Sequence, residues 1–385
     1  MFNREFQYLK DCVGVAVFAN DADVPKTEIG GIYLPAVRQN QIPAVSDCFS
    51  SFGVELPKNI NSFFSREYSA AVSHDIKVGR AALRICSAFE SAGVKLVLMS
   101  GFMMRRYYPK PVYRYTDRLD AVIDEADATA AADIMQKIGF SLRNDDGGVM
   151  VFTEDTGKMT AALLKAGNIG EKAGVTARFL RRAYDEAVPV KSRRSVFRMT
   201  NEHFYTELVL SSAYRFAEGR FGVREVTDIG VFLRRFGDSL DREKTAELLG
   251  DIGLTVFEEQ ISALASCWFF GGARDEFTDI MERAAFCCQQ PENPTEESEH
   301  VKNKRSRFAL LFIFPSFKTM KEQYPFLGPL PILLPFMYIV RIFSLVIFRK
   351  KYVDKRIKGA HSLLSDEVTR EELNAALNGM GVELS

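Results

Sequence analysis

The stretch VYRYTDRLDAVI, residues 112–123, ends in a short apolar segment of strand character. Residues two apart on a strand project from the same face, roughly 6–7 Å from each other. Two carboxylates at that spacing could share a magnesium ion. Here the first of the two positions is Arg118 and the second is Asp120. The pattern is that of a metal-binding strand in which a base has replaced one acid, and it predicts an ion pair between Arg118 and Asp120.

The residues on both sides of this strand predict an alternation of helices and strands. A helical apolar period precedes it and ends at Gly93, and an Ala-rich helical segment follows it and ends at Gly139. Two apolar segments separated by Asp155-Thr156-Gly157 are typical of a β-hairpin. The elements expected are a helix at 77–93, a strand at 94–99, a helix at 102–108, a strand at 118–123, a helix at 126–138, and strands at 149–154 and 158–164.

Beyond residue 170 the apolar period is that of helices. The chain therefore divides into five expected regions of an α+β protein. They are an N-terminal helical cap (1–75), an α+β core with a small mixed sheet (76–170), a helical domain (171–288), a polar linker (289–306), and an apolar and helical C-terminal tail (307–385). The helices expected in the helical domain are 175–187, 201–218, 222–236, 240–251 and 254–270.

The order of these elements resembles the polymerase-β-like nucleotidyltransferase superfamily, and more narrowly a bacterial group of uncharacterised nucleotidyltransferase family proteins. The resemblance rests on LVLMSG (96–101), YYPKPVYR (107–114) and DRLDAVI (117–123). It continues in REVTDIGVFL (224–233) and in the proline-punctuated segment 313–341. It implies a sheet of nucleotidyltransferase type between the N-terminal cap and the C-terminal helical domain.

Nucleotidyl transfer uses carboxylate-bound Mg²⁺ to neutralise the triphosphate and to align the attacking hydroxyl. The resemblance therefore implies a Mg²⁺ cofactor if the chain is active. The candidate catalytic and metal-binding residues are then Asp120 and Asp117. The candidates for binding the phosphates of a nucleoside triphosphate are Ser100, Gly101, Arg114 and Arg118.

Several positions depart from the family pattern. Arg118 occupies the place of the first acid, and Ser100 occupies the place of a lysine. Asp117 falls on the opposite face of a regular strand from Asp120, and a bulge would be needed to bring it round. The later strand, 158–164, contains no third acid. These departures predict a protein with impaired or lost catalysis.

Three hypotheses on function remain open. The first is a nucleotidyltransferase-family protein that serves as a nucleotide- or protein-binding module. The second is an active Mg²⁺-dependent enzyme that moves a nucleotide onto a hydroxyl of a small molecule, RNA or protein. The third is a peripheral membrane scaffold that uses residues 324–351, where the apolar stretch 324–348 precedes a basic end. The alternatives are burial of that stretch, in the protein or against a partner protein or second copy of the chain, and a true membrane span.

The composition gives no general reason to expect a nucleic-acid or anionic-membrane partner, because 50 basic residues balance 50 acidic ones. A basic cluster at 178–198 could contact an anion, or it could be a solvated helix face followed by a basic loop. The six cysteines show no CxxC spacing, which favours a reducing compartment. With no signal-peptide pattern at the start, the expected location is the cytoplasm, with the membrane surface as an alternative. The four histidines lack metal-ligand spacing, so no zinc site is expected.

Overall fold

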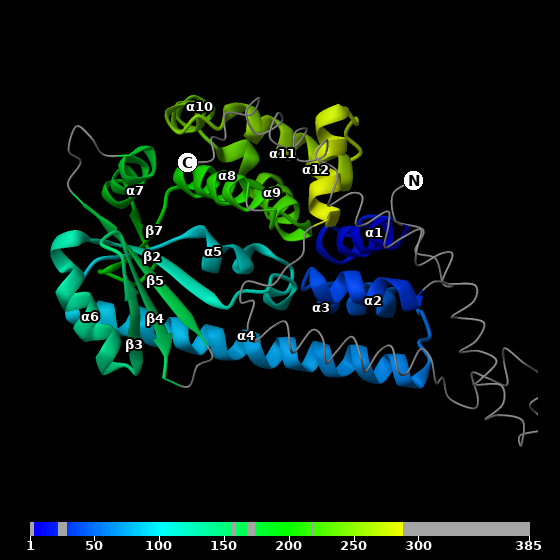
Figure 1. Ribbon diagram of the computed structural model, residues 1–385, viewed down its shortest axis with the longest axis horizontal. Helices are drawn as coiled ribbons and strands as arrows, with labels where there is room; N and C mark the ends of the chain where they lie inside the picture. The colour runs from blue at the N-terminus through cyan, green and yellow to red at the C-terminus, as the bar shows by residue number, and fades with distance from the viewer. Residues whose placement is uncertain (1–3, 22–28, 156–158, 168–173, 218, 288–385) are drawn as a thin grey trace, which may run out of the picture.

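The computed structural model of the chain describes residues 4–21, 29–155, 159–167, 174–217 and 219–287 (Figure 1). The described residues form a mixed sheet of seven strands in the order β3-β4-β5-β2-β1-β7-β6. The strands are β1 (Leu96–Leu98), β2 (Arg118–Asp124), β3 (Phe140–Asp145), β4 (Val149–Glu154), β5 (Thr160–Ala166), β6 (Val188–Pro189) and β7 (Val196–Arg198). The α+β fold with a mixed sheet, predicted from the sequence, is confirmed.

The two central strands are β1 and β2, which run antiparallel with Leu98 opposite Ala121. All three residues of β1 are buried, as expected of a strand covered on both faces. The flanking pairs β2–β5 and β1–β7 are parallel, and the pair β4–β5 is antiparallel, as the predicted hairpin requires. Register in the centre of the sheet therefore decides which side chains meet at the start of β2.

The helix expected at 77–93 is part of a much longer one, α4 (Lys58–Ala92). It begins directly after Pro57 and ends at Gly93, whose positive φ of 69° closes the helix. The first half of α4 buries Phe63 and Phe64 against the other N-terminal helices, so both halves have packing partners. The boundary expected between residues 75 and 76 falls inside this helix.

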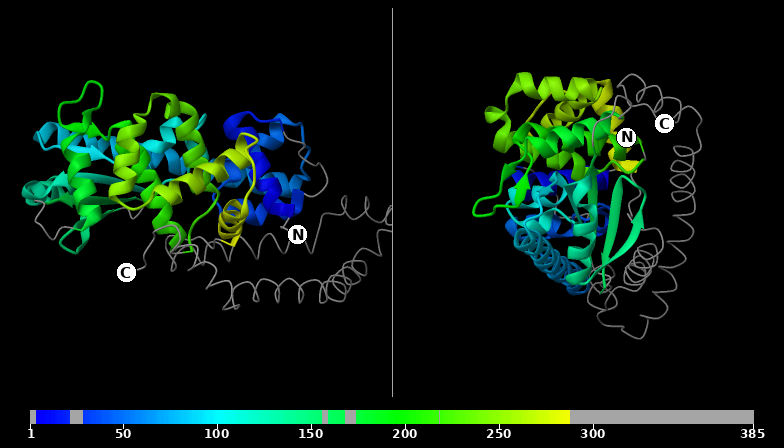
Figure 2. Two further views of the ribbon diagram at one scale, coloured as in Figure 1. Left: turned by 90° about the horizontal axis from the view of Figure 1, so that it is seen from above. Right: turned by 90° about the vertical axis from the view of Figure 1, so that its left-hand side faces the viewer.

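The N-terminal helices α1 (Arg4–Phe18), α2 (Ile29–Arg38) and α3 (Ile42–Ser51) lie at the opposite end of the molecule from the sheet (Figures 1 and 2). Helix α4 runs from these helices to the sheet. Asp47 on α3 fixes the cap to the segment before β2, because its carboxylate accepts hydrogen bonds from Tyr113 at 2.7 Å and from Lys110 at 2.8 Å. The cap thus contacts the core through polar as well as apolar groups.

The C-terminal half of the described chain is largely helical, as predicted. Figure 1 shows α7 to α9 on the opposite side of the sheet from α4 and α6. The remaining helices are α5 (Ser100–Met103), which continues as a 3₁₀ turn (Met104–Tyr107), α6 (Ala128–Lys137), α7 (Val175–Asp185), α8 (Asn201–Ala217), α9 (Val223–Phe236), α10 (Arg242–Asp251), α11 (Thr255–Phe269) and α12 (Glu276–Cys287).

Two parts of the sheet differ from the expectation. Strand β3 pairs with β4, although its residues are mostly exposed and carry no strong strand signal. The segment interpreted as a basic loop contains β6 and β7, which form a short hairpin at the sheet edge. Strand β7 exists because it pairs with β1, a contact between residues about 100 positions apart that no local pattern reveals.

Some expectations concern residues outside the described part of the chain. The linker at 289–306 and the apolar tail at 307–385 both lie there, as does most of the turn 155–157. Among the described residues, no helix combines the length and apolar character needed to cross a membrane.

Candidate functional site

The candidate site lies where the connection from β1 to α5 meets the beginning of β2. The backbone N–H of Met99 donates a hydrogen bond to the carbonyl of Asp120 at 3.0 Å, which places Ser100 and Gly101 beside that acid. A Cβ atom on Gly101 would lie 3.6 Å from Oδ2 of Asp120. The structure therefore brings together Ser100, Gly101, Arg118 and Asp120, four of the six residues predicted from the sequence.

The predicted ion pair between Arg118 and Asp120 is present. Nη2 of Arg118 donates a hydrogen bond to Oδ2 of Asp120 at 3.0 Å, and Nε lies 2.6 Å from Oδ1, an ion-pair contact that is not aligned as a hydrogen bond. The Asp120 side chain is 18% exposed and that of Arg118 is 58% exposed. On the adjacent parallel strand β5 the residue opposite Asp120 is Ala162. Both oxygens of Asp120 thus face a guanidinium, and the neighbouring strand supplies no second acid.

Asp117 does not join Asp120 on one face of β2. The register between β2 and β5 runs without a break from Arg118 to Asp124, so the bulge that would bring Asp117 round is absent from this strand. The carbonyl of Asp117 accepts a hydrogen bond from the Thr160 N–H at 3.2 Å, which extends the same ladder. By strand alternation Asp117 belongs to the face opposite Asp120.

These residues do not fit a Mg²⁺ ion. Mg²⁺ requires nearly octahedral oxygen ligands, usually with one or two carboxylates. Asp120 is neutralised by Arg118 on its own face, and Asp117 belongs to the other face. Within the described ranges no group of three or more His, Cys, Asp or Glu side chains is arranged to hold a metal ion.

Glu207 on α8 is a residue of the site that the sequence interpretation missed. Its carboxyl group is buried and accepts a hydrogen bond from the Ser100 hydroxyl. Burial, followed by the nearby carboxylate of Asp120, raises the pKa of Glu207 to about 8, so the group is largely neutral at pH 7. The signal was an acid in the apolar run ELVL, since glutamate is seldom buried without a partner.

Arg114 does not face solvent at the site but lies beneath it, in buried contacts with Gly101 and Asp228. It is buried, and its Nη2 lies 2.9 Å from Oδ2 of Asp228 on α9. Its Nη1 donates hydrogen bonds to the Gly101 carbonyl and, at 2.7 Å, to Oγ1 of Thr116. The Tyr108 hydroxyl donates to Oδ1 of Asp228 at 2.7 Å. Arg114 therefore ties the turn at Gly101 to α9. Tyr108 and Arg114, which are near each other in sequence, form one buried network with Asp228, 114 positions after Arg114.

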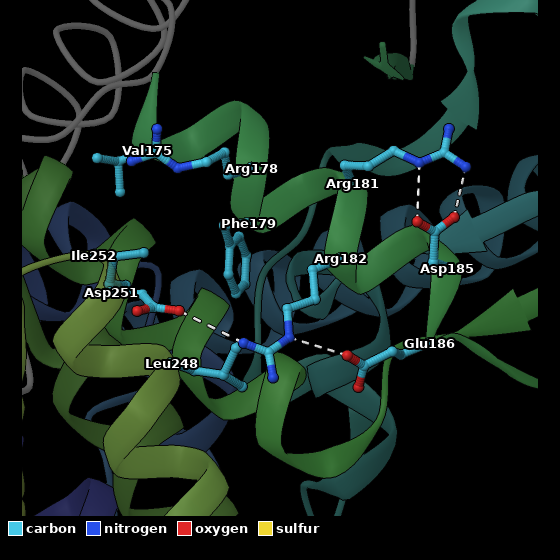
Figure 3. A pocket seen from close by; sticks show the side chains of 10 residues that line it. All are labelled: Val175, Arg178, Phe179, Arg181, Arg182, Asp185, Glu186, Leu248, Asp251 and Ile252. Carbon is cyan, nitrogen blue, oxygen red and sulfur yellow. Dashed lines mark hydrogen bonds and ion pairs between the residues drawn. The ribbon is translucent and has the colours of Figure 1, made fainter. Parts of the chain in front are cut away.

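Two arginines of the basic cluster at 178–198, Arg181 and Arg182, are paired with carboxylates. Arg181 pairs with Asp185 and, at 2.8 Å, with Asp124 at the end of β2. Arg182 contacts Glu186 at 3.0 Å and Asp251 at 3.5 Å across a cavity of about 480 Å³ between α7 and α10 (Figure 3). The walls of this cavity combine these charged groups with Val175, Phe179, Leu248 and Ile252. The charges on its rim thus oppose each other within the protein.

The chain is similar to a known protein family and to two solved structures. Residues 28–270, more than half of the chain, match the sequence model of a family described as "Uncharacterised nucleotidyltransferase". No curated protein sequence matches the chain. Two solved structures of the antibiotic-resistance factor ANT(2'')-Ia are similar at 12% identity. The solution structure covers 46% of this chain and 92% of its own, with a TM-score of 0.35. The crystal structure, in complex with adenylyl-2''-tobramycin, covers 45% and 97%, with a TM-score of 0.34.

Proposed function

The chain belongs to the family of uncharacterised nucleotidyltransferases, and from this premise we propose that it binds a nucleoside triphosphate without transferring the nucleotide. The binding site in this proposal is the junction of β1, α5 and β2, where Ser100, Gly101 and Arg118 meet. Catalysis is lost, and the fold serves as a nucleotide-binding module.

The observation that carries the proposal is the ion pair of Arg118 and Asp120. Transfer of a nucleotide needs metal-bound carboxylates at the β2 positions, because the triphosphate charge must be neutralised while the attacking oxygen is aligned. Replacing an acid by arginine changes the local charge by two units in the wrong direction for a cation. The carboxylate of Asp120 is then paired with the guanidinium, which occupies the side from which a cation would bind.

Glu207, the third carboxyl group near the site, does not restore a set of metal ligands. Glu207 is buried against Ser100, and with a pKa of about 8 it carries little negative charge at pH 7. A neutral carboxylic acid is a poor ligand for a hard cation, which prefers ionised oxygen ligands. The site therefore lacks the pair of ionised acids that the reaction requires.

A transfer assay tests the loss of catalysis. The protein is incubated with each of the four nucleoside triphosphates labelled at the α-phosphate, in Mg²⁺ or Mn²⁺, with small hydroxyl compounds, RNA and the protein itself as acceptors. We expect no pyrophosphate release above that of an Asp120→Asn variant. Metal-dependent transfer by the unmodified protein that Asp120→Asn abolishes would instead identify an active enzyme.

The location and further partners rest on other parts of the sequence. The described cysteines Cys12, Cys48, Cys86 and Cys267 are not in disulfides, which supports a location in the cytoplasm. A protein partner, a second copy of the chain or a membrane surface would use residues 324–351, which lie outside the described residues. Deleting 307–385 and measuring flotation with liposomes tests the membrane role, and unchanged flotation would eliminate it.

A further inference from the structure

We propose that the Arg118 guanidinium takes the place of the divalent cation, so that this site binds the phosphates of its nucleotide without metal. The inference rests on the proposed function and adds how the ligand is held. It concerns one residue, whose position is fixed by the register of β2 and whose charge is opposite to that of the acid expected there.

Position and exposure decide what an incoming ligand meets. Arg118 is the first residue of β2 and projects from the same face as Asp120. The arginine side chain is 58% exposed, whereas the aspartate is 18% exposed. An anion that approaches from solvent therefore meets the positive member of the pair first. A cation that approaches the carboxylate must pass the guanidinium, and the two like charges repel each other.

The ion pair with Asp120 also orients the Arg118 guanidinium before a phosphate binds. A guanidinium is planar and presents its N–H groups in a fork that matches two phosphate oxygens. Asp120 holds Nε and Nη2, so the side chain is already oriented before a ligand arrives. Less conformational freedom is then lost on binding, which improves affinity. The arrangement supplies a fixed, exposed guanidinium, paired with Asp120, at the place where the reaction would need a metal ion.

The neighbouring side chains of Glu207 and Arg114 add no exposed charge to the site. Glu207 turns its carboxyl group toward the Ser100 hydroxyl and is buried, so it is withdrawn from solvent. The positive charge of Arg114 is matched by Asp228 in the interior. Among these side chains, the exposed charge is that of Arg118.

Metal dependence of binding is the decisive measurement. The unmodified full-length protein is titrated by calorimetry with each nucleoside triphosphate, and separately with inorganic tripolyphosphate, in Mg²⁺ and in EDTA. We expect dissociation constants in EDTA equal to those in Mg²⁺ within about threefold, or tighter in EDTA, because Mg²⁺ neutralises the phosphates that the guanidinium contacts. Arg118→Gln weakens binding by about tenfold or more, as expected for loss of a charged hydrogen-bond donor.

Two variants complete the design. Arg84 on α4 is also exposed and paired with a carboxylate, Glu154, at 2.6 Å, so Arg84→Gln is a matched control and leaves binding unchanged. Arg118→Asp restores the acid pair on one face of β2. We expect this variant to bind Mn²⁺, measured by electron paramagnetic resonance without nucleotide, and to bind nucleotide only when metal is present.

The outcomes separate the inference from the proposed function. Nucleotide binding that is at least about tenfold tighter in Mg²⁺ overturns the inference and leaves nucleotide binding standing. Tripolyphosphate binding in EDTA that depends on Arg118, without any nucleotide binding, supports the guanidinium site and overturns the nucleotide-binding function. If neither ligand binds under any condition, both are wrong.

Discussion

Replacing Glu207 by glutamine changes how the stability of the protein depends on pH. The carboxyl group is buried beside Ser100 and Asp120, and its pKa is raised from an ordinary value of 4.5 to about 8. Glutamine keeps the size and the hydrogen-bonding oxygen of the side chain but has no proton to lose. The comparison of the two proteins therefore isolates the titration of one residue.

The sign follows from proton binding in the two states. Between pH 4.5 and about 8 the folded protein keeps the proton on Glu207, while the unfolded chain releases it. Rising pH therefore favours the unfolded state, and the stability linked to this group is fully present below pH 4.5. The free energy of unfolding falls by about 1.4 kcal/mol per pH unit within the window. From pH 5 to pH 7 this amounts to about 2.5 kcal/mol, slightly less than the full slope over two pH units, because titration of the unfolded chain is only about three-quarters complete at pH 5.

Urea-induced unfolding at pH 5, 6 and 7 measures the effect. The single tryptophan, Trp268 on α11, lies in the core of the helical part and reports loss of that packing. We expect the stability of Glu207→Gln relative to the unmodified protein to increase by about 2.5 kcal/mol across this range. Any constant offset caused by the substitution cancels in the slope.

A second buried acid provides a control with the opposite sign. Burial acts to raise the pKa of Glu225, but Arg224 and Arg215 outweigh it and the pKa is lowered. The stability linked to Glu225 is therefore lost only at acidic pH, below the ordinary value of 4.5. The free energy of unfolding of Glu225→Gln must then change with pH in the same way as that of the unmodified protein between pH 5 and pH 7. If Glu207→Gln is parallel as well, Glu207 is ionised in the folded protein and the reasoning about the site is wrong.

Three further substitutions test the frame of the site. Asp228→Asn leaves the buried Arg114 without its counter-charge, and we expect the free energy of unfolding in urea to fall by about 3–5 kcal/mol. Arg84→Gln, which breaks an exposed pair, should lower it by less than about 1 kcal/mol, and equal losses would contradict the assigned role of Asp228. Asp47→Asn removes the charge that Tyr68, Tyr113 and Lys110 contact, with an expected cost of about 1–2 kcal/mol and no change in the pH slope between 5 and 7. Gly222→Ala would place a Cβ atom 2.4 Å from Oε1 of Gln39, which accepts a hydrogen bond from the Val223 N–H at 3.1 Å, so we expect a lower melting temperature. Gly250→Ala on α10 places its Cβ in open space, so the melting temperature should stay unchanged or rise. The reverse order would refute the packing argument.

Much of the fold follows from short-range patterns in the sequence. Gly93 and Gly139 end helices because their positive φ angles, 69° and 81°, are accessible to glycine at little cost. The apolar segment 96–98 and the segment 118–124, with its apolar run Ala121–Ile123, form central strands of the sheet, as predicted. Where the signal was weak, as in the exposed strand β3 and the two-residue strand β6, pairing with neighbours decided the structure.

The candidate site divides in the same way. The pair of Arg118 and Asp120 could be predicted, because residues two apart on a strand share a face whatever the rest of the chain does. The contacts of Ser100 with Glu207 and of Arg114 with Asp228 join residues 107 and 114 positions apart. Such contacts depend on how α8 and α9 pack over the sheet. The sequence by itself therefore determined the charge at the beginning of β2. Only tertiary packing decided that a neutral acid, Glu207, lies beside Ser100, because burial is what raises the pKa of Glu207.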